Sequence, residues 1–183
     1  MLEFPIGNKA CWQNRVQTSE KLESWLYDDS SLTKKLKNLC TEFELVLLGQ
    51  DTFSKAELPQ FSSDTENSED SLIREVILYC DNKPWVYAHT QIPKRTLEHG
   101  NQFLSELGHQ PLGEALFSQP NMKRDNIQVA KFASHSPVYR FVENNLAISF
   151  NHDLFGRRSQ FSLDSFPLVV TEVFLPDSFL YHV

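Results

Sequence analysis

The chain has 183 residues and a mass of 21.2 kDa, which predicts one domain over residues 1–183 that can bury a core without a disulfide or a metal. Hydrophobic residues make up 40% of the chain and charged residues 22%, which excludes a wholly disordered protein. The formal net charge of -7 argues against binding to nucleic acid or to anionic membranes.

The compartment is predicted from what the sequence lacks. No stretch approaches the roughly 20 apolar residues of a membrane span, and the start of the chain does not resemble a secretory signal. Cys11, Cys40 and Cys80 are odd in number, widely spaced and form no CxxC pair. We therefore expect three reduced thiols in a cytoplasmic protein without membrane insertion. No apolar seam is evident, so we expect a monomer.

The first half of the chain predicts two helices followed by strands. A short helix is expected over Lys21–Tyr27, and a second after the N-cap candidates Asp28–Ser31, with Leu32, Leu36, Leu39 and Cys40 on one side. The polar, acidic stretch Ser62–Ser71 predicts a solvated loop. Strands are expected over Phe43–Leu48, Ile73–Cys80 and Pro84–Ile92, with a tight turn at Asp81-Asn82.

The second half of the chain is also predicted to contain both helices and strands. A helical run is expected from Leu97 to Leu107, ending at Gly108, and a short helix from Pro111 to Phe117. Strands are expected over Asn126–Phe132, part of Val138–Phe150, Phe155–Leu163 and Leu168–Leu175. The last is apolar on both faces and should be central. The fold class is therefore α+β: a single antiparallel, strongly twisted sheet with helices covering one side.

Several kinds of chemistry have no support in the sequence. The six glycines form neither GxGxxG nor GxxxxGK[ST], and no GxSxG or HExxH motif occurs. The six histidines never fall at metal-ligand spacing. We therefore expect neither a metal nor an organic cofactor.

Two charged residues lie in strands that are predicted to be buried. By a period of two, Arg74 shares a face with Val76, Leu78 and Cys80, and Glu172 lies between apolar neighbours on its own strand. A buried charge costs several kcal/mol unless it is paired. One interpretation is that Arg74 and Glu172 pair, with each other or with other groups, for structural reasons. The other is that both line an enclosed pocket that binds a carboxylate.

A second basic feature is Gly156-Arg157-Arg158-Ser159. Here the pattern favours a solvent-facing strand start after a turn over an anion-binding site.

The chain resembles the bacterial chorismate pyruvate-lyases over about residues 20–181. The matching stretches run from Trp25 to Lys34, from Arg74 to Trp85, from Leu107 to Phe117, and from Gly156 through Thr171-Glu172-Val173-Phe174 almost to the end. The resemblance implies a buried ligand cavity beneath helical flaps, in which a lyase converts chorismate to 4-hydroxybenzoate and pyruvate without a cofactor, as the first committed step of ubiquinone biosynthesis.

The resemblance also implies four substrate-binding positions, at Leu32, Arg74, Leu112 and Glu172. Leu32 and Leu112 should begin helices, where amide N–H groups lack intrahelical partners and can donate to a ligand. We expect Arg74 to anchor the ring carboxylate and Glu172 to orient the 4-hydroxyl and assist proton movement. The role of Glu172 as acid, base or hydrogen-bond partner stays open.

Two departures from the family pattern stand out. His89 occupies a position where some relatives carry arginine, which weakens any role in holding the second substrate carboxylate. The segment Ala133–Asp153 reads as an extended hairpin.

Two other functions stay open. A related fold serves as a ligand-sensing module of transcription regulators, and such a domain would bind an aromatic carboxylate without reaction. A structural domain with an Arg74–Glu172 core pair would bind no ligand at all.

Overall fold

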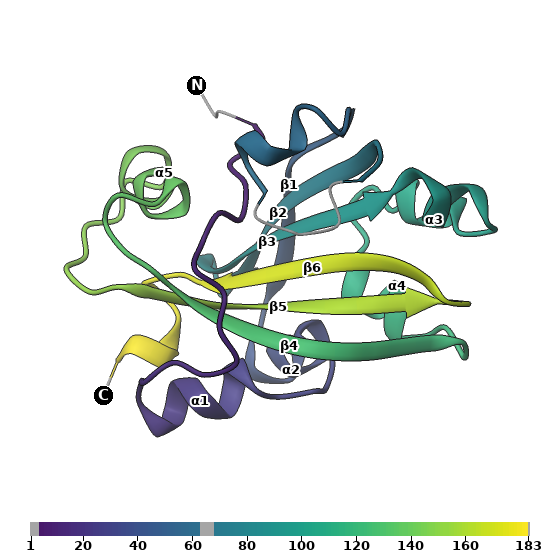
Figure 1. Cartoon of the computed structure of the whole chain (residues 1–183). Helices are drawn as coiled ribbons and strands as arrows, with labels where there is room; N and C mark the ends of the chain where they lie inside the picture. Colours follow the sequence, from purple (N-terminus) through teal and green to yellow (C-terminus); the bar gives the residue numbers. More distant parts are fainter. Residues whose placement is uncertain (1–3, 63–67, 183) are drawn as a thin grey trace.

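The computed structural model describes residues 4–62 and 68–182, and it is organised around one antiparallel sheet (Figure 1). The strands are β1 (Phe43–Phe53), β2 (Ser71–Cys80), β3 (Lys83–Pro93), β4 (Met122–Phe132), β5 (Leu154–Leu163) and β6 (Phe166–Phe174). Their order is β1-β2-β3-β6-β5-β4. The strands change direction steeply from β1 to β4, so the sheet is strongly twisted (Figure 1). The predicted fold class, α+β with a single antiparallel and strongly twisted sheet, is confirmed, but helices cover both sides of the sheet and not one side as predicted.

A tight turn with left-handed backbone joins β2 to β3. Asp81 and Asn82, with φ of 49° and 62°, join β2 to β3, as the sequence predicted. Short polar side chains, Asn and Asp above all, tolerate this region best. β6 lies between β3 and β5 and carries buried residues on both faces, which confirms its predicted central place.

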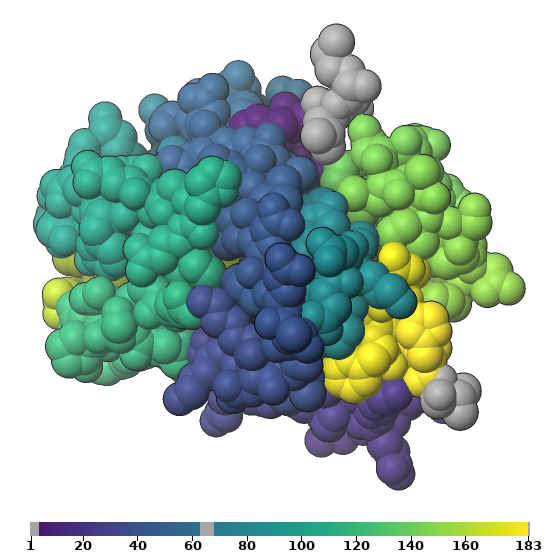
Figure 2. All heavy atoms as spheres, turned by 180° about the vertical axis from the view of Figure 1, so that it is seen from behind, coloured from purple at the N-terminus to yellow at the C-terminus, as the bar shows by residue number. Residues whose placement is uncertain are grey.

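The first face of the sheet is covered by α1 (Glu20–Leu26), α2 (Leu32–Leu39) and α4 (Leu112–Phe117). Trp25 and Leu36 pack against Leu78 of β2 in one core cluster. α2 begins where the sequence predicted, because the Ser31 hydroxyl accepts a hydrogen bond from the Lys34 amide at 3.3 Å. Figure 2 shows the molecule from behind, with α2 in dark blue and the segment that carries α4 in green-teal over this face.

The second face is covered by α5 (Pro137–Asn145) and by the N-terminal segment, which crosses the sheet (Figure 1). The strand expected within Val138–Phe150, and the hairpin expected over Ala133–Asp153, are therefore wrong. Ser136 caps the helix by accepting from the Tyr139 amide, and proline occupies its first turn. The aromatic and β-branched residues that suggested a strand pack at helical spacing instead.

The helical run expected from Leu97 to Leu107 is broken into α3 (Lys94–Glu98) and a 3-10 helix (Gln102–Ser105). Gly100 separates them with φ of 84°, which ends a helix. Two further 3-10 helices cover Leu58–Gln60 and Phe179–Tyr181. The predicted loop over Ser62–Ser71 falls largely on residues 63–67, which lie outside the described residues.

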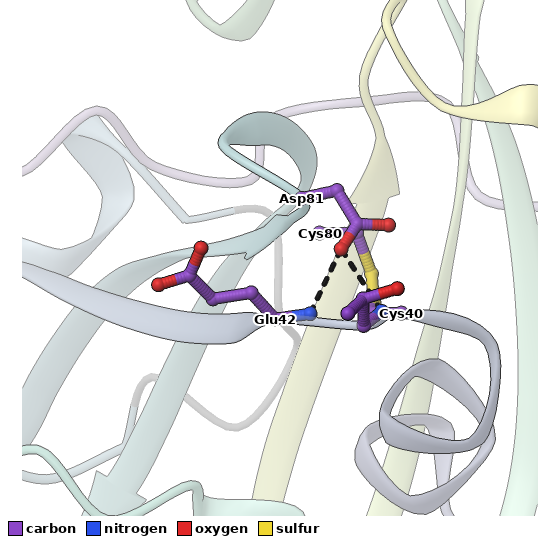
Figure 3. Close-up of a disulfide and its surroundings, with 5 residues drawn as sticks. Cys40, Glu42, Cys80 and Asp81 are labelled. Carbon is purple, nitrogen blue, oxygen red and sulfur yellow. Dashed lines mark hydrogen bonds between the residues drawn. A yellow bond between two sulfur atoms is a disulfide. The ribbon is translucent and has the colours of Figure 1, made fainter.

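A disulfide between Cys40 and Cys80 joins the end of α2 to the end of β2 (Figure 3). The two Cα atoms are 5.2 Å apart. Beside the bridge, Asp81 Oδ1 accepts from the amides of Thr41 and Glu42 at 2.9 and 2.8 Å. The prediction of reduced thiols is thus wrong for this pair, because the fold brings together two cysteines that no short motif connects. Cys11 is free and exposed.

Reduction of this bridge should destabilise the protein. It closes a loop with a sequence separation of 40, and a loop of that length stabilises the fold by about 4 kcal/mol on the chain-entropy model. We expect dithiothreitol to lower the free energy of unfolding in urea by roughly 2–4 kcal/mol. Cys40→Ser should do the same, whereas Cys11→Ser should change nothing. Titration of three free thiols in the untreated protein would contradict the bridge.

A buried carboxylate fastens the N-terminal segment to the second face. Glu75 accepts hydrogen bonds from the amides of Ile6 and Gly7 at 2.9 and 2.7 Å and from the Tyr87 hydroxyl at 2.8 Å. Nδ1 of His89 lies 3.0 Å from the same carboxylate, and both side chains are fully buried. Burial raises the pKa of Glu75, but His89 and the two amides outweigh it and hold the pKa below its usual value.

Glu75→Gln should therefore destabilise the protein by about 3 kcal/mol at neutral pH, because the buried network loses its negative charge and one of its two acceptor oxygens. A carboxyl with a lowered pKa stabilises the fold above its unfolded pKa and loses this effect as pH falls through its folded pKa. The stability difference from the parent protein should thus shrink below about pH 4. Urea unfolding at several pH values measures it, with the exposed Glu143→Gln on α5 as control. A difference that does not depend on pH would contradict the assignment.

Candidate functional site

A cavity lies between the first face of the sheet and the starts of α2 and α4. Its empty space, the open mouth included, is about 580 Å³. Much of its lining is apolar: Leu45, Val76, Leu78, Ala88, Leu116, Phe117, Phe161 and Val170. Its charged lining residues are Arg74, Arg124, Arg157 and Glu172.

Arg74 reaches the cavity from β2 and is only 2% exposed. Its guanidinium donates to Gln50 Oε1 at 3.1 Å and to the carbonyls of Gly108 and Gln110 at 2.8 and 3.3 Å. All three acceptors are neutral, and no carboxylate of the described residues lies within ion-pair distance. Burial lowers the pKa of Arg74. The site thus holds a desolvated cation without an anionic partner.

Glu172 reaches the cavity from β6 and is paired with a different arginine. Its Oε2 accepts from Arg157 Nε at 2.7 Å, and Arg157 is 1% exposed. Arg157 Nη1 also donates to the carbonyls of Trp25 and Asp28 at 2.9 and 2.6 Å. Arg157 therefore fixes the Glu172 carboxylate in place and ties it to the connection between α1 and α2.

These contacts show which partners Arg74 and Glu172 have. Arg74 and Glu172 do not pair with each other, although both have partners and both line the cavity. The expectation that Arg157 faces solvent is wrong. Adjacent residues on a strand point to opposite faces. Arg157 faces the cavity, and Arg158 is half-buried on the second face, where it lies over the ring of Trp12.

Leu32 and Leu112 also line the cavity, each as the first residue of its helix. The two helix starts lie against each other: a Cβ on Gly113 would come within 3.0 Å of Thr33 Oγ1, and Lys37 of α2 pairs with Glu114 of α4. Amides in a first helical turn have no intrahelical acceptor. The structure thus places all four predicted site residues on the wall of one cavity.

His89, which the sequence analysis also considered, does not line the cavity. His89 lies on the second face with Glu75, so it cannot reach a ligand held beside Arg74. No group of three His, Cys, Asp or Glu side chains within residues 4–62 and 68–182 could hold a metal ion. Over the same residues, no helix is long and apolar enough to cross a membrane.

Arg124 is a cavity residue that the sequence analysis did not single out, whereas Arg157 was considered and expected to face solvent. It belongs to the polar stretch Met122–Asn126, which carries no apolar alternation. The pairing of β4 with β5 shifts register between Arg124 and Ile127, so a period of two does not predict the direction of Arg124. Its guanidinium lies 5.1 Å from the ring centre of Phe161, another cavity residue.

Known proteins resemble this chain along most of its length. The family model described as "Chorismate lyase" matches residues 6–183. A probable chorismate pyruvate-lyase of Psychromonas ingrahamii is 40% identical over 97% of this chain and 96% of its own length. A protein of the same name from Pseudoalteromonas translucida is 36% identical over 99% of this chain and 100% of its own.

Solved structures share the fold at low identity. A GntR-family transcriptional regulator from Bacillus cereus matches with a TM-score of 0.51 at 12% identity, over 76% of this chain and 95% of its own. The gene product SA0254 of Staphylococcus aureus also reaches 0.51, at 11% identity, over 81% and 90%. These likenesses concern the sheet and its covering helices alone.

Proposed function

The chain belongs to the chorismate lyase family, and we propose that it converts chorismate to 4-hydroxybenzoate and pyruvate in the first committed step of ubiquinone biosynthesis. The observation that carries the proposal is Arg74, a guanidinium buried in an apolar cavity with only neutral partners among the described residues. Such a group is suited to a ring carboxylate, to which it can donate charge-assisted hydrogen bonds.

The reaction needs positioning and proton management rather than a strong reagent. Chorismate carries a ring carboxylate at C1, an enolpyruvyl ether at C3 and a hydroxyl at C4. The C3–O bond breaks with its electron pair on the departing oxygen, C4 loses its proton, and the ring becomes aromatic. The departing enolpyruvate takes up one proton to become pyruvate, so atoms and charge balance. Aromatisation supplies the driving force, and the protein orients the substrate and stabilises developing charge.

Arg74 is proposed to hold the ring carboxylate at one end of the cavity. Three of the five N–H groups of a guanidinium are used in its hydrogen bonds to Gln50, Gly108 and Gln110. Two remain for a ligand. The amides of Leu32 and Leu112, at the starts of two helices on the cavity wall, are proposed to donate to the same carboxylate.

Glu172 is proposed to meet the C4 end of the ring, where the hydroxyl is oriented and the proton leaves. Its hydrogen bond from Arg157 fixes the carboxylate, and a positioned carboxylate of this kind can accept a hydrogen bond or a proton.

Purified protein incubated with chorismate should release 4-hydroxybenzoate and pyruvate in equal amounts, measured by chromatography against a protein-free control. Turnover with unequal products would contradict the proposed reaction. Binding of 4-hydroxybenzoate without turnover would instead favour a ligand-sensing module.

Arg74→Ala should weaken binding of 4-hydroxybenzoate about 100-fold, which corresponds to about 2.7 kcal/mol. Isothermal titration calorimetry measures this, and Arg74→Lys serves if the alanine variant does not fold. Arg140→Ala is the matched control, since Arg140 is exposed on α5 beyond the second face. Unchanged product affinity in both Arg74 variants would remove Arg74 as the anchor.

Glu172→Gln should lower kcat about 100-fold, in the range expected for loss of a general acid or base. Its melting temperature should change less than that of Glu75→Gln, because the hydrogen bond from Arg157 can be retained by the amide oxygen. Glu143→Gln is the control. A normal kcat in Glu172→Gln would exclude Glu172 from the chemistry.

A further inference from the structure

Arg124 and Arg74 enter the cavity from opposite flanks of the sheet. Arg74 lies on β2 and Arg124 on β4, with β3, β6 and β5 between them. Neighbouring strands are about 4.8 Å apart, so the two side chains start far from each other and converge on the cavity. A ligand between them can meet one guanidinium at each end.

The orientation of Arg124 is fixed by neutral groups. Nε and Nη2 donate to Ser159 Oγ at 3.0 and 2.7 Å, and Nη1 donates to the Asp28 carbonyl at 3.3 Å. The Asp28 carboxylate is paired with Lys35. No carboxylate among the described residues lies within ion-pair distance of Arg124. Arg124 is half-buried, unlike Arg74, but like Arg74 it is a positioned cation with no carboxylate of the described residues in an ion pair with it.

The charges of the cavity do not cancel. Three arginines and one glutamate line it, which leaves an excess of two positive charges among the described lining residues. Glu172 neutralises Arg157, so the excess resides on Arg74 and Arg124. Burial, followed by the charge of Arg157, lowers the pKa of Arg124 to about 10, although the carboxylates of Glu172, Asp29 and Asp28 act in the opposite direction. A further anion beside Arg124 would add to the effect of these carboxylates and stabilise its charge.

We propose that Arg124 binds the second carboxylate of the substrate, the one on the enolpyruvyl ether, and holds it while the C3–O bond breaks. This rests on the proposed function and assigns a further substrate-binding residue to it. Chorismate is a dianion, and its two carboxylates would match the two unpaired guanidinium groups. When the C3–O bond breaks, each product is a monoanion, and each leaves from its own arginine.

The inference separates ligands by the number of carboxylates they carry. 4-Hydroxybenzoate has only the ring carboxylate, whereas 3-(carboxymethoxy)benzoate has a second one on an ether at C3 and cannot eliminate pyruvate. Arg124→Gln should weaken binding of the dicarboxylate by roughly 30- to 100-fold and raise KM for chorismate similarly. Affinity for 4-hydroxybenzoate should change less than about threefold. Arg124→Lys, which keeps the charge, should recover part of the dicarboxylate affinity.

Arg158→Gln is the matched control. Arg158 adjoins Arg157 on β5 but points to the second face, where it donates to Gln128 and lies over Trp12. It should leave both affinities unchanged. Equal weakening of both ligands by Arg124→Gln would mean a structural role, and no weakening of either would mean no contact; each result overturns the inference. If the parent protein does not turn over chorismate, the proposed function fails, while the comparison of the two ligands still tests Arg124.

Discussion

Burial of positive charge on an apolar sheet face is the constraint on which the arrangement of this chain depends. Moving a guanidinium out of water costs several kcal/mol unless its donors are satisfied. Arg74 is satisfied by carbonyls at Gly108 and Gln110, just before α4. Arg157 is satisfied by the carbonyls of Trp25, in the last turn of α1, and of Asp28, between α1 and α2. Each arginine therefore fastens to the sheet the segment that leads into one covering helix. The arginines that make the cavity positive therefore also help to position the helices that cover it.

The two faces of the sheet handle charge in opposite ways. Arg74 and Glu75 are consecutive on β2 and so point to opposite sides. On the second face the Glu75 carboxylate is surrounded by donors and closes a compact network that holds the N-terminal segment. On the first face the cations outnumber the carboxylates. A closed network stabilises structure, whereas an open excess of one sign is useful only to a ligand of the other sign.

The strands and the inward direction of Arg74 and Glu172 could be predicted because a period of two leaves few choices for a charge between apolar neighbours. The same rule cannot say which of the adjacent Arg157 and Arg158 is inside. The direction of the Arg124 side chain could not be predicted, because a register shift in β4 breaks the alternation. α5 was mistaken for a strand because its buried face is aromatic and β-branched, and helical spacing in nine residues is a weak signal.

The pairing of Cys40 with Cys80 shows a different limit, since it depends on where α2 ends relative to β2 and on no local pattern.

The net charge of the whole chain does not indicate the charge of its cavity. The chain as a whole carries -7, yet the lining of its cavity carries an excess of two positive charges. Exposed acidic side chains are screened over a Debye length of about 8 Å at physiological ionic strength. Guanidinium groups in an apolar cavity are screened far less, so they dominate the field that a bound anion experiences. An acidic protein can therefore present a positively charged cavity to an anion, provided that some cations of that cavity, here Arg74 and Arg124, have no carboxylate within ion-pair distance among the described residues.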